Sequence, residues 1–381
     1  MIYHKPQGEQ MKVIIKEQKT YNLEEVIANI RVIFTELNIF EKLKDKQTIL
    51  LKPNLLAPYH PDKAVTTHPV VIEAVIIILK ELNKDIAVGD SCGGSHKIQA
   101  VWDKTGVLDV CQRHNVRLLE FGKEGVVNIQ TDLANFIFDK NVVEYDAIIN
   151  IAKMKTHSLM LFTGAVKNLY GVIPGLYKTE LHKHFIEPEN FSFLLSAIYG
   201  LLKKNIILNI IDGIVGMDGA GPSGGNPFPF GILLASEKAS AVDYVATELM
   251  GFEFKDMTYL IDSIKDDNLS ISDIIIDDKW KGFKFKNVNL KTVLFRSRIV
   301  NKLPKFLSNW FQKLISFYPV MPKSCKLCLV CMQSCPVKVI TLKEERLVFD
   351  KKDCIKCLCC HELCPDSEIK LKKHLLAKLF L

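Results

Sequence analysis

Nine of the eleven cysteines in this chain of 381 residues lie between positions 325 and 364, and their spacing constrains what that region can fold into. Eight of them form two copies of one pattern, C-x2-C-x2-C-x3-C-P. The copies are Cys325, Cys328, Cys331 and Cys335, then Cys354, Cys357, Cys360 and Cys364. Cysteines two residues apart in series rarely reach disulfide geometry, and the first residues contain no apolar secretory segment. The cysteines therefore predict a metal site in a cytoplasmic protein.

The pattern also indicates which metal centre to expect. Zinc ribbons pair two C-x2-C knuckles, whereas three thiolates on one loop suit three irons of a cubane, and the fourth ligand comes from the other copy. The arrangement resembles the bacterial two-cluster ferredoxin and predicts two 4Fe-4S clusters. The predicted ligand sets are Cys325, Cys328, Cys331 and Cys364 for one cluster, and Cys354, Cys357, Cys360 and Cys335 for the other. Cys359 is predicted to be an unligated neighbour, because Cys360 keeps the spacing.

Composition and charge limit the remaining possibilities. A hydrophobic content of 48% with 24% charged residues is typical of a soluble protein with two or three domains. No apolar run approaches the ~20 residues that a membrane-spanning helix needs. The net charge is +7, yet residues 279–343 contain fourteen Lys or Arg and no Asp or Glu. This asymmetry suggests a cationic face for an acidic partner, and no motif for binding nucleic acid accompanies it.

The chain before the cysteines alternates between strand and helix patterns. Apolar runs predict strands at residues 13–15, 48–51, 86–88, 147–151, 206–211 and 231–235, and helical periodicity predicts helices at 23–37, 70–82, 98–113, 191–202 and 240–250. Such alternation predicts an α/β fold with a mostly parallel sheet and helices on its faces. The predicted domains are an α/β domain at 11–285, a basic linker at 286–322, a small α+β ferredoxin-like domain at 323–370 and a tail at 371–381.

Polar residues gather where these strands are predicted to end, and ligands of α/β domains bind beyond the carboxyl ends of the strands. Taken singly, such residues are turn glycines, solvated lysines, helix-capping carboxylates or buried histidines. Taken together, they predict a cleft that binds an anion. Lys52, Asn54, Asp90, Lys167 and Asn168 are predicted to bind the substrate, and His68, His157, Lys153 and Lys155 to act in catalysis. The two histidines are the candidate proton donors, because histidine titrates near pH ~6.5.

The same loops resemble the "domain of unknown function 362" family of bacterial and archaeal proteins. The residues that carry the resemblance are KPN at 52–54, AVTTHP at 64–69, GDS at 89–91, KMKTH at 153–157, GAVKNLYGVIPG at 164–175 and DGIVGMDGAGPSGG at 212–225. Many members end in a two-cluster ferredoxin module, so the resemblance implies iron–sulfur electron transfer without a settled substrate. Cys92 departs from the pattern, which has proline at this position.

Two further patterns leave alternatives open. His182 and His184 form an H-x-H pair that could bind a metal on a strand, or simply decorate the surface. Residues 303–318 repeat apolar side chains at helical spacing, including Trp310 and Phe311. They predict an amphipathic helix that docks on its own protein, with contact to a membrane surface as the alternative.

Three functions are compatible with these features. The first is an oxidoreductase in which a redox partner protein or another low-potential electron donor feeds the clusters, and a small anionic substrate in the cleft is reduced. The second is a non-catalytic electron-transfer subunit whose large domain binds a partner or a ligand. The third is a non-redox enzyme with structural clusters, although two complete clusters exceed what structural support requires.

Overall fold

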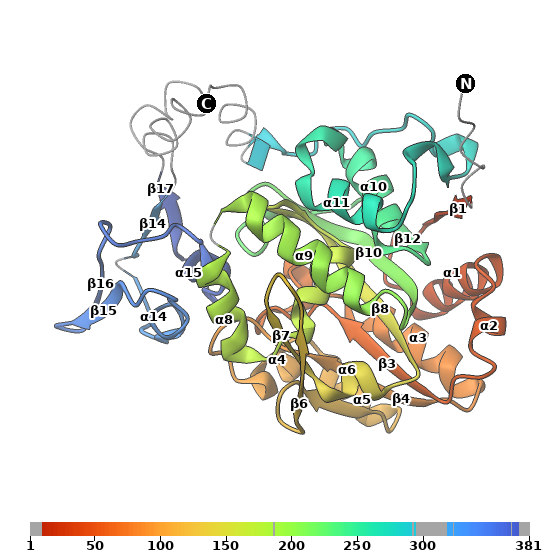
Figure 1. Cartoon of the computed structure of the whole chain (residues 1–381), viewed down its shortest axis with the longest axis horizontal. Coiled ribbons are helices and arrows are strands. Elements are labelled where there is room, and N and C mark those ends of the chain that lie inside the picture. The colour runs from red at the N-terminus through yellow and green to blue at the C-terminus, as the bar shows by residue number, and fades with distance from the viewer. Residues whose placement is uncertain are drawn as a thin grey trace.

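A mostly parallel sheet forms the centre of the large domain in the computed structural model, which describes residues 10–185, 187–291, 293–294, 318–322, 324–366 and 368–372 (Figure 1). The strand order is β2-β12-β10-β8-β3-β4-β5. Their bounds are β2 (Ile14–Glu17), β3 (Thr48–Pro53), β4 (Asp85–Asp90), β5 (Arg117–Glu120), β8 (Ala147–His157), β10 (Ile206–Asp218) and β12 (Ile232–Ser236). From β10 to β5 every neighbouring pair is parallel, whereas β12 is antiparallel to β10 and to β2.

Helices cover both faces of this sheet because consecutive strand residues point to opposite sides. Along β3, Leu50 packs into the core on one face, while Ile49 and Leu51 pack into the core on the other. One face is covered by α1 (Leu23–Glu36), α3 (Pro69–Glu81), α4 (Ile98–Lys104) and α5 (Val107–Arg113). The other is covered by α7 (Ala165–Asn168), α9 (Pro188–Leu202), α10 (Ala239–Met250) and α11 (Thr258–Asp266). The predicted α/β fold is confirmed.

Smaller elements complete the large domain. They are β1 (Met11–Lys12), α2 (Ile39–Lys42), β6 (Val126–Gln130), β7 (Asn135–Asp139), α6 (Lys140–Glu144), β9 (Leu161–Thr163), α8 (Gly175–His184), β11 (Asn226–Phe228) and β13 (Ile274–Ile275). The helix predicted at residues 98–113 is two helices, α4 and α5. Gly106 separates them with a φ of 74°, in the left-handed region that glycine adopts without strain.

Strand β8 is longer than predicted, and this changes the place of three predicted site residues, Lys153, Lys155 and His157. KMKTH was expected in a loop after residue 151, but it forms the second half of β8. The strand continues because β9 pairs with it, with Lys155 opposite Thr163 and His157 opposite Leu161. All of β8 is buried, and alternate residues share a face, so Lys153, Lys155 and His157 lie on the same side.

The C-terminal module is small and internally repeated. It contains β14 (Tyr318–Val320), α14 (Val330–Gln333), β15 (Ile340–Lys343), β16 (Arg346–Phe349), α15 (Cys359–Glu362) and β17 (Lys370–Lys372). β14 pairs with β17, and β15 pairs with β16. Each cysteine motif wraps through two left-handed residues, with φ of 55° and 61° at Leu327 and Leu329 and of 57° and 63° at the equivalent Lys356 and Leu358. The matching backbone makes the motifs two copies of one loop.

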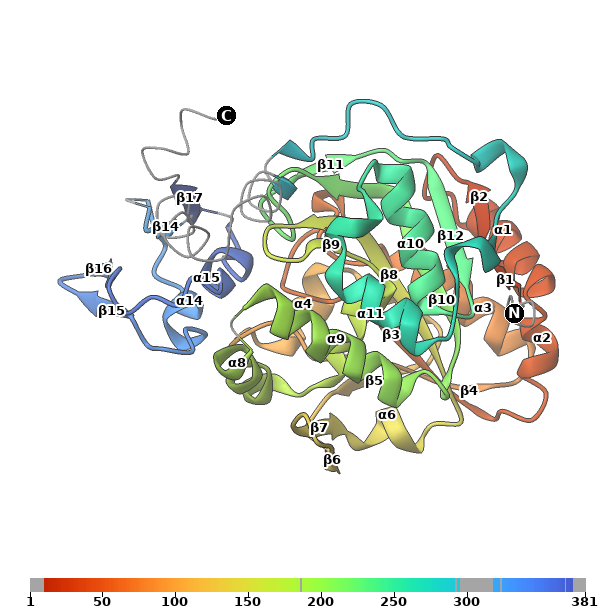
Figure 2. The same cartoon turned by 45° about the horizontal axis from the view of Figure 1, so that its top comes forward.

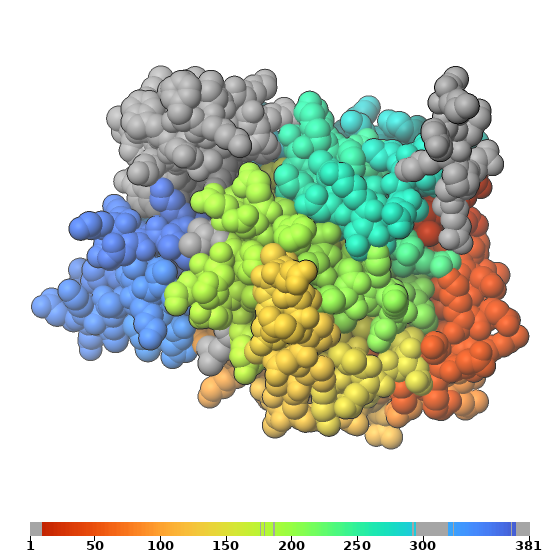
Figure 3. Space-filling view, in the orientation of Figure 1, coloured from red at the N-terminus to blue at the C-terminus, as the bar shows by residue number. Residues whose placement is uncertain are grey.

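The module packs against the large domain beside α8 (Figures 1 and 2), and Figure 3 shows its surface continuous with that of the large domain. His96 Nε2 lies 2.9 Å from the carbonyl oxygen of Leu363, and the backbone N–H of Ser95 donates to Ser334 Oγ at 3.1 Å. The Tyr59 hydroxyl donates to the carbonyl of Cys364. Residues in the loops after β3 and β4 therefore hold α14 and α15 in place.

Among the described residues, no helix is both long enough and apolar enough to cross a membrane. The predicted amphipathic helix at 303–318 lies outside the described residues, except for the backbone of its last residue.

Candidate functional site

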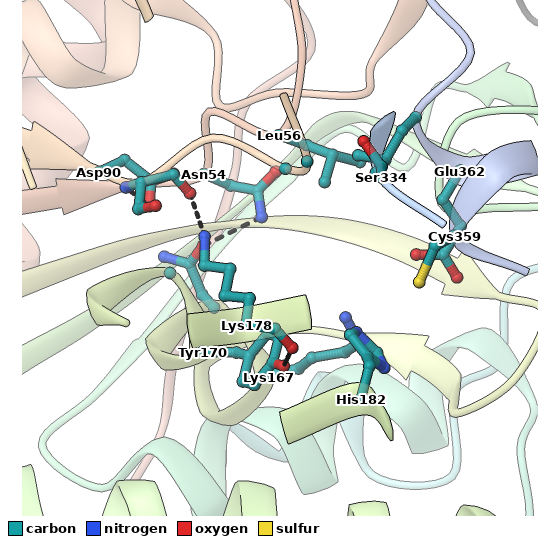
Figure 4. A pocket seen from close by; sticks show the side chains of 16 residues that line it. Asn54, Leu56, Asp90, Lys167, Tyr170, Lys178, His182, Ser334, Cys359 and Glu362 are labelled. Atoms are coloured by element: carbon teal, nitrogen blue, oxygen red, sulfur yellow. Dashed lines mark hydrogen bonds between the residues drawn. The ribbon is translucent and has the colours of Figure 1, made fainter. Parts of the chain in front are cut away.

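A cavity of about 90 Å³ lies between the large domain and the C-terminal module. Figure 4 shows residues of both parts around it, with Asn54 and Asp90 on one side and Cys359 and Glu362 on the other. The lining residues from the large domain are Asn54, Leu56, Asp90, Ser91, Gly93, Gly94, Lys167, Asn168, Tyr170, Gly171, Lys178 and His182; those from the module are Ser334, Cys359, Glu362 and Leu363. We call this cavity the interdomain pocket.

Asp90 is fixed at the end of β4 by a buried ion pair. Its Oδ1 lies 2.8 Å from Lys52 Nζ, and its carboxylate also accepts from the backbone N–H groups of Leu55 at 2.7 Å and Ser91 at 2.8 Å. Burial lowers the pKa of Lys52, and the attraction of Asp90 opposes this shift. Lys52 thus lies behind the pocket and neutralises Asp90, instead of lining the pocket as predicted.

A chain of side-chain amides connects the pocket to the core of the sheet. Asn54 Nδ2 donates to Asn168 Oδ1 at 3.0 Å, and Asn168 Nδ2 donates to Asn150 Oδ1 at 2.8 Å. Lys155 Nζ donates to Asn54 Oδ1 at 3.0 Å and to the carbonyl of Val65 at 2.5 Å. These bonds fix which end of each amide faces the pocket. Lys155 supports Asn54 from behind and does not itself line the pocket.

Lys167 is the lysine of this pocket that keeps its ammonium uncommitted. Among the described residues it has neither a hydrogen bond nor an ion pair, although it lines the pocket. Burial lowers its pKa, while Glu362 and Cys359 across the pocket raise it. The short helix α7 carries Lys167, and the carboxylate of Asp243 holds the start of α7 by accepting from the backbone of Ala165 at 2.5 Å.

Helix α8 supplies two pocket residues, Lys178 and His182, that were not predicted from the sequence to line this site. Lys178 donates to the carbonyl of Ser91 and, at 3.4 Å, to that of Cys92, and burial lowers the pKa of Lys178 to about 8. His182 stacks on Phe191 with ring centres 4.7 Å apart, and burial lowers its pKa to about 3. Both face the pocket because residues four apart share one side of a helix. A helix predicted over residues 175–184 would have placed Lys178 and His182 on the same side, because they are four residues apart.

The H-x-H pair does not lie on a strand as predicted, because both residues belong to α8. Residues two apart on a helix point in different directions. His182 therefore faces the pocket, whereas His184 lies exposed at the helix end, with its Nε2 3.1 Å from Glu180.

Lys153 and His68 belong to a separate buried cluster and do not line the pocket. Lys153 Nζ forms an ion pair with Asp212 at 2.8 Å and donates to the Tyr21 hydroxyl at 2.9 Å. The His68 ring stacks on Tyr21 at 3.5 Å, and its Nδ1 accepts from the backbone of Val70 at the start of α3. Burial lowers the pKa of His68 to about 4. These side chains pair with one another, so Lys153 and His68 do not join Lys167 at the pocket as predicted.

His157 lies at the boundary between the two parts. Its Nδ1 accepts from the backbone N–H groups of Leu159 and Met160, both at 3.1 Å, so the proton of the neutral ring is on Nε2. That nitrogen lies 3.3 Å from Glu362 Oε1 of the module. Burial, followed by repulsion from Lys167 and Lys155, holds the pKa of His157 well below its usual value. His157 is therefore neutral, and its Nε2 lies near Glu362 without a hydrogen-bond partner among the described residues.

In each cysteine motif, one cysteine has a cysteine of the other motif among its neighbours. The electrostatic neighbours of Cys331 are Cys328, Cys325 and Cys364 of the other motif. Cys354 in turn has Cys357 and Cys335 as neighbours. Backbone N–H groups also point at the sulfurs, from Leu327 to Cys325 Sγ at 3.4 Å and from Lys356 to Cys354 Sγ at 3.3 Å. Among the described residues no three His, Cys, Asp or Glu side chains are placed to hold a single metal ion. The spacing of the cysteines, with amide donors beside two of the sulfurs, is what fits a 4Fe-4S module.

Comparison with known proteins finds separate family matches for the large domain and for the C-terminal module. Residues 49–248 match the model of the family "Domain of unknown function (DUF362)", and residues 319–365 match that of a "4Fe-4S dicluster domain". The chain is 30% identical over 242 residues to the Thylakoid-associated protein sll1697 of Synechocystis sp., covering 62% of this chain and 74% of the relative.

Two solved structures show a weak similarity. The lactate racemase apoprotein of Thermoanaerobacterium thermosaccharolyticum has a TM-score of 0.41 at 15% identity, over 65% of this chain and 59% of that one. A Thermotoga maritima protein from a structural genomics consortium has a TM-score of 0.39 at 14% identity, over 61% and 59%. This chain thus spans about 59% of each. On its sequence match, the chain belongs to the DUF362 family and carries a C-terminal 4Fe-4S electron-transfer module.

Proposed function

We propose that this protein transfers electrons through two 4Fe-4S clusters to a small anion held in the interdomain pocket. The observation that carries the proposal is the composition of the pocket wall. Strand-end residues of the large domain form one side, and Cys359 and Glu362 of the module form the other. Cys359 directly precedes the predicted cluster ligand Cys360. A ligand in this pocket would touch both the anion-binding groups and the cluster-binding loop.

The lining residues favour a small anion over a larger ligand. Typical ligand pockets measure about 300–1,000 Å³, and this cavity is about 90 Å³. Lys167 offers an unpaired ammonium, and the amides of Asn54 and Asn168 are held in fixed orientations. Lys178 adds a second positive charge below pH of about 8. Charge-assisted bonds from ammonium groups are the strong contacts for carboxylate or phosphate oxygens.

The clusters, when bound, supply one electron each. A two-electron reduction of the anion would draw on both, would take up two protons from solvent, and would need a low-potential carrier protein to reload them. Glu362 lines the pocket from the module, and His157 of the large domain lies beside it, with Nε2 3.3 Å from Glu362 Oε1. They would keep water out of the pocket wall and hold α15 in position.

The test begins with protein purified without oxygen. We expect about eight irons, since two cubanes hold four each, and native mass spectrometry should identify a retained small anion. Adding that anion to dithionite-reduced protein should oxidise the clusters, followed by visible absorbance, and Lys167→Gln should slow this step. If the clusters are oxidised at the same rate with and without the anion, the result would instead support a non-catalytic electron-transfer subunit. An iron count near four would refute the two-cluster assignment.

A further inference from the structure

Among the described residues, two carboxylates line the interdomain pocket, and their hydrogen bonding differs. Asp90 is paired with Lys52 and accepts from two backbone N–H groups. Glu362 is only 9% exposed, yet no residue that the structure describes donates a hydrogen bond to it. His157 Nε2 lies 3.3 Å from Glu362 Oε1 without forming such a bond. Because a buried acceptor without a donor is unfavourable, Glu362 offers its carboxyl oxygens to a ligand in the pocket.

Lys167 lines the same pocket from α7 and lacks partners in the same way (Figure 4). Its ammonium has no hydrogen bond and no ion pair within the part of the chain that the structure describes. Lys167 and Glu362 are therefore not paired with each other, although their charges attract across the cavity. A ligand that satisfies both needs an anionic group for Lys167 and a hydrogen-bond donor for Glu362.

The charges around the pocket select between the two common kinds of donor, an ammonium and a hydroxyl. Asp90 is neutralised by its own partner, and His182 is neutral because burial lowers its pKa to about 3. Among the described lining residues, two ammonium groups then remain, Lys167 and Lys178, against one carboxylate, Glu362. A ligand with one negative charge and a neutral hydroxyl balances this excess, whereas an ammonium would cancel the charge of the ligand.

We propose that the anion of the interdomain pocket is that of a short-chain hydroxy acid, whose carboxylate binds Lys167 and whose hydroxyl donates to Glu362. The inference rests on the anion-binding function proposed above, deepens it by naming the class of anion, and concerns binding alone. It makes Glu362 a residue that determines specificity, because an acid without the hydroxyl leaves the buried carboxyl oxygens unpaired. A carboxyl group keeps an acceptor oxygen in either protonation state.

The experiment measures binding by calorimetric titration of the full-length protein, purified without oxygen. The probes are two pairs of acids that differ only in a hydroxyl: glycolate with acetate, and 3-hydroxypropionate with propionate. The two pairs differ in the reach from carboxylate to hydroxyl. Glycine is the fifth probe, because it has an ammonium where glycolate has the hydroxyl.

Three variants assign the hydroxyl contact. Glu362→Met removes the acceptor oxygens with little change in length, and Glu362→Gln keeps one of them. Gln333→Met makes the matched change at the equivalent position of the first motif, which is exposed. Iron content is measured for each variant, because Glu362 lies two residues from the predicted cluster ligands Cys360 and Cys364.

In the parent protein, at least one hydroxy acid should bind about ten- to a hundredfold more tightly than its partner acid, as expected for a hydrogen bond to a charged group. Glu362→Met should abolish this preference and leave the affinity for acetate in place. Glu362→Gln should retain part of the preference, and Gln333→Met should retain all of it. If Glu362→Met loses iron, the titrations of the parent protein still decide the outcome.

Equal affinities within both pairs in the parent protein would overturn the inference, as would a preference that persists in Glu362→Met at full iron content. Tighter binding of glycine than of glycolate would assign an ammonium donor and overturn it as well. In each of these cases, an affinity for acetate that depends on Lys167 would leave the anion-binding function intact. If none of the acids binds, both the inference and the anion-binding function are wrong.

Discussion

At the scale of single residues, the pocket depends on which lysines are already paired. Lys52 and Lys153 each have a buried carboxylate partner at 2.8 Å, so their charges are neutralised within the fold. Lys167 has no such partner among the described residues and faces the pocket. The sequence predicted cationic residues near the strand ends, but it could not predict this pairing. Asp90 and Asp212 reach their lysines only through the strand order of the sheet.

Lys167→Gln should weaken the binding of sulfate, used as a simple probe anion, by about ten- to a hundredfold. The reason is the loss of one charge-assisted contact, worth roughly 1.5–3 kcal/mol. Calorimetric titration measures the effect, and iron content should not change. Lys183→Gln on the exposed side of α8 is the matched control, because it removes the same charge outside the pocket. Equal affinities for the two variants would show that Lys167 does not bind the anion.

Sulfate binding should also weaken as the pH rises through about 8. Burial lowers the pKa of Lys178 to about 8, so its ammonium loses the proton in this range, while sulfate itself keeps its charge. Titrations between pH 6 and 9.5, about two units below and above that pKa, measure the step. In Lys178→Gln we expect weaker binding at pH 7 and a smaller decrease above it. A step of the same size in this variant would assign the titration to another group.

At the scale of elements, β8 illustrates what the sequence could and could not provide. Its first half, residues 147–151, is apolar and was predicted as a strand for that reason. The second half, KMKTH, is predicted to follow the strand as a loop, and lysine is among the residues that are least often fully buried. Its lysines and histidine are buried here because every one has a partner: Asp212 for Lys153, Asn54 for Lys155 and backbone N–H groups for His157. Asp212 and Asn54 lie far from their lysines in the sequence, whereas the backbone N–H groups that bind His157 belong to the nearby Leu159 and Met160.

A further prediction at the scale of elements concerns Gly94, in the loop after β4 that contacts the module. A Cβ at Gly94 would lie 2.1 Å from Ser334 Oγ of the module, and Gly94 has a φ of 60°. Gly94→Ala should therefore push α14 away from the large domain and expose the pocket. We expect faster hydrogen exchange in α14 and α15 and slower electron transfer to the retained anion, with iron content preserved.

Gly282→Ala provides the matched control for this change. Gly282 has a similar left-handed φ of 72°, but a Cβ there would meet no atom within 4 Å. The backbone strain is thus comparable, whereas the collision with the module is absent. If both variants accelerate exchange in α14 and α15 equally, strain and not interdomain contact would account for the effect.

At the scale of the whole molecule, the two cysteine motifs cannot be treated as separate sites. Each predicted ligand set takes its fourth cysteine from the other motif, and the neighbours of Cys331 and Cys354 agree with this crossing. Cys335→Ala should therefore damage the cluster bound by Cys354, Cys357 and Cys360, although it lies in the first motif. Electron paramagnetic resonance of the reduced protein distinguishes the clusters. If Cys335→Ala instead removes the signal of the cluster bound by Cys325, Cys328 and Cys331, the crossed assignment is wrong.

The sequence was most informative at this largest scale. The order of strands and helices predicted the α/β domain, and the cysteine spacing predicted the module. Neither pattern contains information about how the two parts meet. The interface depends on shape: Leu363 packs where Gly93 leaves room, and His96 reaches the carbonyl of Leu363. Glu362 and Cys359 became candidates only because they lie across the pocket from Lys167.

A module built from two equivalent loops could in principle attach in two orientations, related by exchanging α14 and α15. The two loops, residues 325–340 and 354–369, differ at nine of sixteen positions; among them, Gln333 corresponds to Glu362 and Ser334 corresponds to Leu363. In the orientation observed, Glu362 is buried near Lys155 and Lys167, and Gln333 is exposed to solvent; burial raises the pKa of Glu362, and the two lysines oppose this shift. In the opposite orientation the two lysines would face an amide. The difference between Glu362 and Gln333 thus favours the orientation observed, in which Cys359 and Glu362 line the pocket and Cys328 is exposed.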